Sequence, residues 1–84
     1  MGMMKRIGIP ILEEMFFGGP GTRMELWNRL GERGVDLEWA TFKRFMSHLR
    51  SDGMLQTLPC TPAHPHTRIA LTKEGQTIVQ ELLG

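Results

Sequence analysis

The chain has 84 residues, 40% of them hydrophobic and 23% charged, which fits one globular domain rather than a disordered chain. Its formal net charge is +1, so any affinity for nucleic acid must come from local clusters of cations, not from an overall basic charge. The single cysteine, Cys60, excludes an internal disulfide, and no apolar run is long enough for a membrane span. We therefore expect an intracellular protein of the cytoplasm, nucleoid or organelle matrix that does not associate with a membrane.

Residues 1–8 are predicted to form an N-terminal tail, and residues 9–84 the folded domain. A first helix is expected up to the glycine cluster at 18–21, because glycine and proline together end a helix. Its apolar arc consists of Ile11, Leu12, Met15 and Phe16. Glu13 and Glu14 are predicted to lie on the opposite, exposed side.

Two further helices are indicated by their start and stop signals. Thr22 and Glu25 have the spacing of a capping box at the start of the second helix. Asp36 is a natural N-cap for the third helix, and Gly53 suits the left-handed turn that ends it. The apolar side of the third helix consists of Phe42, Phe45, Met46 and Leu49.

The last third of the chain is predicted to form a hairpin followed by a helix. Residues 54–58 and 67–71 read as short strands, and the prolines between them make the hairpin tip an irregular loop. Thr72 can cap the final helix, and Gly75 lies on its inner face, where a missing side chain allows close backbone approach. The rest of that inner face is Ile78, Val79, Leu82 and Leu83. The fold class is therefore α+β, mainly α: a winged helix-turn-helix with three helices, a two-stranded β-wing and a C-terminal helix.

The outer surface of the third helix is the main candidate for a nucleic-acid contact. It combines cations, which pair with phosphates or guanine edges, with small residues that allow close approach to a groove. Its members are Ala40, Lys43, Arg44, Ser47, His48, Arg50 and Ser51. The alternative is an ordinary solvated helix face.

The hairpin loop is the second candidate. His64, His66 and Arg68 would contact the sugar–phosphate backbone or the minor groove if the loop acts as a wing, and the alternative is a stiff exposed tip without a partner. Cys60 with the two histidines also has the chemistry of zinc ligands, but a fourth ligand is missing. We therefore expect no metal.

No catalytic motif or phosphate-binding glycine loop is present, so we expect no enzyme, no cofactor and no small-molecule substrate. Trp39 and Phe17 are candidates for a protein interface instead, since a half-exposed aromatic side chain can anchor a partner. For Trp39 the alternative is a residue at the edge of the core.

Two short motifs resemble a known family. The segment 49–55, Leu-Arg-Ser-Asp-Gly-Met-Leu, is similar to the end of the recognition helix in bacterial MarR-like and PadR-like regulators. The segment 71–75, Leu-Thr-Lys-Glu-Gly, is similar to the entry into the helix after their wing. The order of elements over residues 9–83 agrees, although the wing here is rich in proline and histidine rather than lysine and arginine. The resemblance implies a DNA-binding winged helix.

The sequence thus favours a non-enzymatic, transcription-regulator-like module that contacts DNA or RNA through its third helix and wing. The alternative is a structural, protein-interaction subunit of a larger ribonucleoprotein such as an organellar ribosome. Salt dependence separates the two hypotheses, because phosphate contacts weaken steeply with salt and an apolar interface does not.

Overall fold

A computed structural model describes residues 7–84. It contains four helices and one two-stranded antiparallel sheet in the order expected from the sequence. The elements are α1 (Ile9–Gly18), α2 (Arg23–Glu32), α3 (Trp39–Ser51), β1 (Leu55–Leu58), β2 (Arg68–Leu71) and α4 (Lys73–Leu83). The predicted α+β, mainly α fold class is confirmed. Among these residues, no helix combines the length and hydropathy that crossing a bilayer requires.

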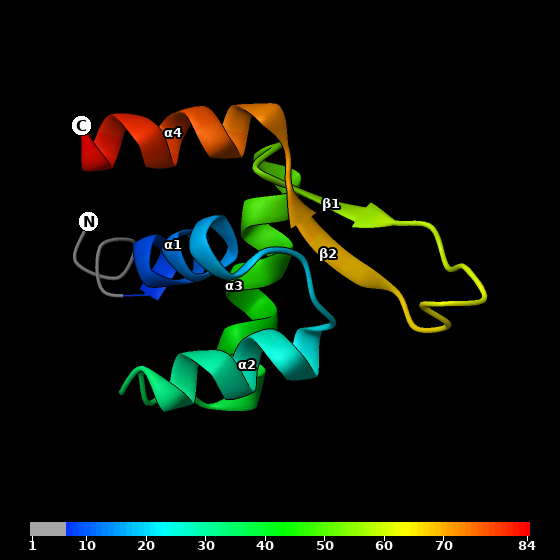
Figure 1. The fold of residues 1–84 in the computed structure, drawn as a ribbon. Helices are drawn as coiled ribbons and strands as arrows, with labels where there is room; N and C mark the ends of the chain where they lie inside the picture. The colour runs from blue at the N-terminus through cyan, green and yellow to red at the C-terminus, as the bar shows by residue number, and fades with distance from the viewer. Residues whose placement is uncertain (1–6) are drawn as a thin grey trace.

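The helices enclose one hydrophobic core, and the hairpin projects from it (Figure 1). α4 lies above α1 and α2 lies below it, and α3 runs across behind α1 and α2. The most deeply buried side chains are Phe42, Ile11, Leu12, Leu26, Leu30, Leu49 and Val79. Every helix contributes to this set, so the exposed faces of α3 and the hairpin are held by a shared core.

The hairpin is anchored to the start of α2 by backbone hydrogen bonds. In the ladder Leu55 pairs with Leu71 and Leu58 with Arg68. On its other edge, β2 forms an isolated bridge to Gly21: the Ile69 N–H donates to the Gly21 carbonyl at 2.8 Å, and the Gly21 N–H donates back at 3.2 Å. The first residues of α2 are therefore fixed beside the base of the hairpin.

Most of the predicted start and stop signals are confirmed. Thr22 and Glu25 form a complete capping box, and the Thr72 hydroxyl accepts a hydrogen bond from the Gly75 N–H at 3.1 Å. Gly53 has a φ of 80° in the turn after α3. A Cβ on Gly75 would collide with the Met54 carbonyl oxygen, which confirms the close backbone approach expected there.

The predicted N-cap of α3 is wrong. The helix begins at Trp39 with Glu38 as N-cap and no side-chain capping bond, not at Asp36. The reason is the preceding segment, which is extended: its Val35 and Leu37 pack against the core, and the Leu37 carbonyl accepts a 2.7 Å hydrogen bond from the Trp27 indole. Tertiary packing therefore delays the start of the helix.

Two predictions about helix faces are also wrong. Glu14 was expected to be exposed like Glu13, but its exposed fraction is only 9%, because Arg29 of α2 packs against it and pairs with its carboxylate. Leu82 and Leu83 are not buried: they are 52% and 49% exposed, because the last turn of α4 extends past the core.

The predicted boundary between tail and domain lies at the edge of the described residues. Ile7 and Gly8 continue the helical winding ahead of α1, and Ile7 packs against the core. Residues 1–6 of the expected tail lie outside the described residues. The division at residue 8 stays a prediction.

Candidate nucleic-acid interface

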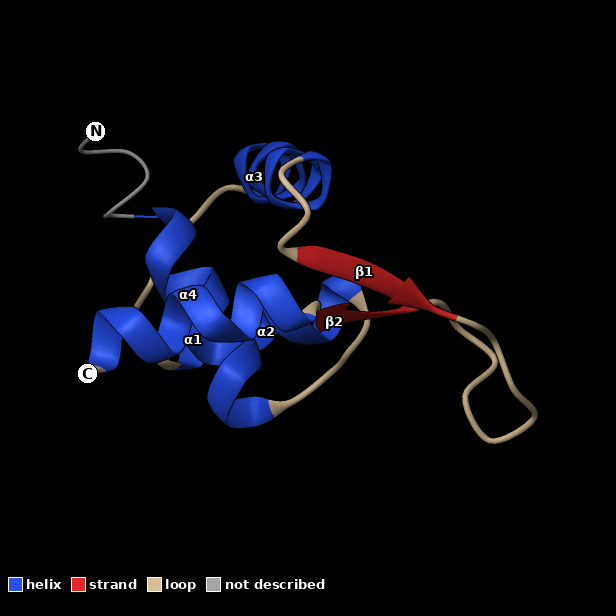
Figure 2. Ribbon diagram, turned by 90° about the horizontal axis from the view of Figure 1, so that it is seen from above, coloured by secondary structure: helices blue, strands red, loops and turns tan. Residues whose placement is uncertain are grey.

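α3 lies at one edge of the molecule with a full face uncovered. Seen end-on in Figure 2, it has the other three helices all on one side of it. Phe42, Met46 and Leu49 face that side and are buried. All seven residues predicted for nucleic-acid contact on this helix are exposed: Ala40, Lys43, Arg44, Ser47, His48, Arg50 and Ser51.

Helical geometry divides these seven residues into a central row and two flanks. At about 100° per residue, Ser51, Arg44 and Ala40 form the row that points most directly away from the buried face. Lys43, Ser47 and Arg50 lie on one flank of this row, and His48 lies on the other. The outermost row of α3 therefore carries one arginine between two small residues, with basic side chains on both sides of it.

Trp39 holds one of these cations. The Lys43 ammonium lies 5.7 Å from the centroid of the Trp39 ring, a cation–π contact. The ring itself stacks on Phe42 at 5.6 Å between centroids and meets Trp27 edge-on at 5.2 Å. Trp39 is thus half-buried at the edge of the core, and its ring is anchored in an aromatic cluster.

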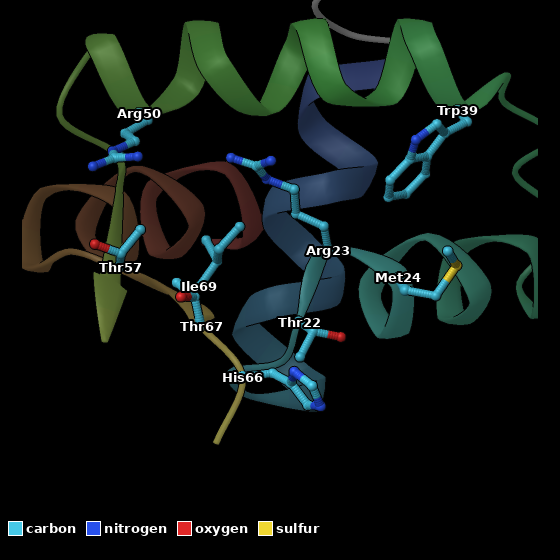
Figure 3. A pocket seen from close by; sticks show the side chains of 9 residues that line it. All are labelled: Thr22, Arg23, Met24, Trp39, Arg50, Thr57, His66, Thr67 and Ile69. Carbon is cyan, nitrogen blue, oxygen red and sulfur yellow. The ribbon is translucent and has the colours of Figure 1, made fainter. Parts of the chain in front are cut away.

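A groove runs between α3, the start of α2 and the hairpin. It has a volume of about 600 Å³, and we call it the wing groove. Its lining residues are Thr22, Arg23, Met24, Trp39, Arg50, Thr57, His66, Thr67 and Ile69 (Figure 3). Arg23 rises from the start of α2 toward α3, and Arg50 descends from the last turn of α3. The groove brings two arginines and a histidine together around an apolar floor.

Arg23 was not among the residues predicted from the sequence. It was missed because it precedes the apolar pattern of α2 and has no cationic neighbour in the chain. The Gly21–Ile69 bridge is what carries it to the hairpin, and this long-range pairing leaves no local signal. The same holds for Thr57, an exposed residue of β1 whose side chain also lines the groove.

The three predicted residues of the hairpin are brought together. His64, His66 and Arg68 line a second hollow of about 330 Å³, beside Met24 of α2. The Nε of Arg68 is buried and has no hydrogen-bond partner within residues 7–84. The hairpin loop therefore folds back toward the start of α2, next to the wing groove.

Other arginines serve the fold instead. Arg29 Nε lies 3.0 Å from Glu14 Oε2, and Arg33 Nη1 lies 3.5 Å from Glu14 Oε1. In the part of the chain that the structure describes, these are the only ion pairs. The cations of α3 and the wing groove have no carboxylate partner there.

The carboxylate nearest the groove is already engaged. The Thr22 N–H donates to Glu25 Oε1 at 2.8 Å, and the Glu25 N–H donates to the Thr22 hydroxyl at 3.2 Å. The first of these bonds stabilises the charged carboxylate and holds the pKa of Glu25 below its ordinary value. Glu25 is thus committed to the capping box rather than to the groove arginines.

Two other features considered from the sequence are a metal site at Cys60 and an aromatic protein interface. Cys60 Sγ lies 3.7 Å from the Thr67 hydroxyl, and residues 7–84 contain no group of three side chains suited to hold a metal ion. The absence of a bound metal stays an expectation. Phe17 is 67% exposed and packs edge-on against Phe16, and no described contact joins it to Trp39. The two predicted interface aromatics do not form one patch.

Comparison with solved structures gives one informative match. A crystal structure of a PadR-family transcriptional regulator from Eggerthella lenta superposes with a TM-score of 0.72, covering 99% of this chain and 76% of that one. The fold is a winged helix. At 22% sequence identity the likeness establishes the fold alone. No family model and no curated protein sequence matches the chain.

The winged-helix fold assigns a place to each part of the surface. α2 and α3 form the helix-turn-helix, and the β1–β2 hairpin is the wing. The wing groove runs between α3, the start of α2 and the wing, and the wing histidines lie beside it.

Proposed function

We propose that this winged helix is a DNA-binding, transcription-regulator-like module that inserts α3 into a DNA groove and rests its wing on the backbone beside it. The observation that carries the proposal is the exposed face of α3. Small side chains at Ala40, Ser47 and Ser51 let the backbone approach bases closely, and cations on the same face can pair with phosphates or guanine edges.

Duplex DNA fits this face better than duplex RNA. The major groove of B-form DNA is about 12 Å wide and admits an α-helix. The corresponding groove of an RNA duplex is too deep and narrow for side chains to read. An exposed helix face that combines small residues with cations suits the first shape. The binding partner is therefore proposed to be B-form DNA.

The comparison with a transcriptional regulator supports the same proposal. It offers nothing for the alternative of a ribonucleoprotein subunit. A non-enzymatic role is part of the proposal, because the solved structure of similar fold is a transcriptional regulator.

The test removes two neighbouring cations from the exposed face of α3. With Lys43→Ala and Arg44→Ala combined, we expect weaker binding to duplex DNA and a salt slope lower by about one to two units, near one per lost phosphate contact. The unfolding free energy is expected to change by only about 0.5 kcal/mol, since both residues are exposed and Lys43 loses a weak cation–π contact.

Arg33→Ala is the matched control. It removes a cation at the far end of α2, where Arg33 pairs with Glu14, and is expected to leave the salt slope unchanged. Binding is measured to duplex DNA and to structured RNA at several salt concentrations. An unchanged slope in the double variant would refute α3 as the contacting helix. If Trp39→Ala then released a protein partner, the interaction-subunit alternative would replace the proposal.

A further inference from the structure

Among the described residues, the wing groove is lined by two arginines and by no acidic residue. The DNA contacts proposed for the exposed face of α3 do not account for this pair. Arg23 and Arg50 line this groove together, and both also line a smaller hollow beside it. The two arginines come from different helices and point into the same space (Figure 3). Within residues 7–84 neither guanidinium has a side-chain hydrogen bond or an ion pair. Neither hollow has an acidic lining residue.

Two cations that share a hollow without an anion repel each other, and this arrangement favours any anion that fits between them. The surroundings narrow the chemistry of that anion. Thr57 lines both hollows, and His66 lies at the other side of the groove (Figure 3). The N–H groups of a guanidinium and nearby hydroxyl groups can donate hydrogen bonds to the oxygens of a phosphate.

We infer that the wing groove seats one backbone phosphate of the bound DNA, clamped between Arg23 and Arg50. This inference rests on the proposed function and adds a contact that lies outside the exposed row of α3. The DNA strand would pass between the start of α2 and the wing, with Ile69 and Trp39 forming the apolar wall under its sugars. Arg23 is held in place for this by the Gly21–Ile69 bridge.

The decisive measurement is the salt slope of duplex binding for Arg23→Ala, Arg50→Ala and the double variant. Each single change is expected to weaken binding by roughly tenfold, the size of one charge-assisted contact. The double variant is expected to lower the salt slope by about one unit, because both arginines neutralise the same phosphate. Arg23→Lys keeps the charge and should retain most of the slope.

The outcomes separate this inference from the proposed function. A slope lower by about two units in the double variant would mean two separate phosphates and would overturn the shared clamp. If Arg23→Ala behaves like the control Arg33→Ala while the Lys43 and Arg44 double variant still weakens binding, the groove inference fails and the proposed function stands. If none of these variants changes the slope, both fail.

A second arm distinguishes the DNA backbone from a free phosphate compound. Inorganic phosphate is added to the preformed protein–DNA complex, with chloride of equal ionic strength as the reference. We expect inorganic phosphate to displace DNA no more than chloride does. The phosphate bound in the wing groove belongs to the duplex, and the other contacts of the duplex hold it in place. Saturable displacement by millimolar phosphate, absent in Arg23→Ala, would assign the groove to a free ligand and overturn the inference.

Discussion

The two ends of α2 carry arginines in opposite situations. At its start, Arg23 points into the wing groove without an acidic partner among the described residues. At its end, Arg29 and Arg33 reach across to Glu14 of α1, and the Arg29 guanidinium also donates to the Gly19 carbonyl at 2.9 Å. The start of α2 thus places an arginine without an ion pair, and its end places arginines in ion pairs that join it to α1.

This difference explains how a nearly neutral chain can offer a cationic surface. One acid, Glu14, neutralises the arginines that join α1 to α2. Glu25 is engaged in the capping box of Thr22. The cations on α3 and at the start of α2 have no ion pair among the described residues. The net charge of +1 is therefore compatible with a surface on which unpaired cations are concentrated.

The largest expected effect comes from removing the acid at the structural end. Glu14→Ala leaves Arg29 partly buried without its carboxylate, and we expect the unfolding free energy to fall by about 2 kcal/mol, discounted for the solvent exposure of the pair. Duplex binding by the folded protein is expected to be unchanged. Chemical denaturation measures this, with Glu13→Ala as the neighbouring control. A loss of binding with unchanged stability would reverse the assignment of the two ends.

Charge reversal at each end of the helix makes the comparison symmetrical. Arg33→Glu places a second carboxylate beside Glu14, and we expect it to reduce the unfolding free energy by about 1 kcal/mol while binding is unaffected. Arg23→Glu is expected to leave stability within about 0.5 kcal/mol and to weaken duplex binding more than Arg23→Ala does. Equal effects of the two reversals on binding would show that only net charge matters.

The smallest effect concerns the capping box beside Arg23. Because the pKa of Glu25 is lowered in the folded state, its contribution to stability is present above the pKa of the unfolded chain and is lost as pH falls through the folded value. Stability should therefore decline below about pH 4.5, the ordinary glutamate value. Glu25→Gln removes the titrating carboxyl group and should make this decline shallower. Urea midpoints between pH 5 and 3 measure the decline; an identical decline in both proteins would contradict the contribution assigned to Glu25.

The fold was predictable because short local sequence signals mark the ends of its helices. Thr22, Gly53 and Thr72 each act on residues within one turn of themselves, so the local sequence carries the whole signal. Gly75 was predicted as a contact residue for the same reason, from its place on the apolar face of α4. The same reasoning failed for the N-cap of α3, because the packing of Leu37 against the core outweighed the capping preference of Asp36.

The candidate site was only half predictable. The exposed face of α3 follows from helical periodicity, so its residues could be read from the sequence. Arg23 could not, because its position depends on a bridge between Gly21 and Ile69, 48 residues apart in the chain. The exposure of Glu14 was wrongly predicted for a similar reason, because its burial depends on an arginine of another helix.

The central claim is that α3 and the wing groove form one DNA-binding surface. The most direct test is an amide NMR titration of the protein with a nonspecific DNA duplex at low salt, where phosphate contacts dominate. We expect the shifts to concentrate at the start of α2, along α3 and at the base of the wing, and to spare α1 and the last turn of α4. Shifts confined to α1 and α4, or none at all while the duplex is in excess, would contradict the account.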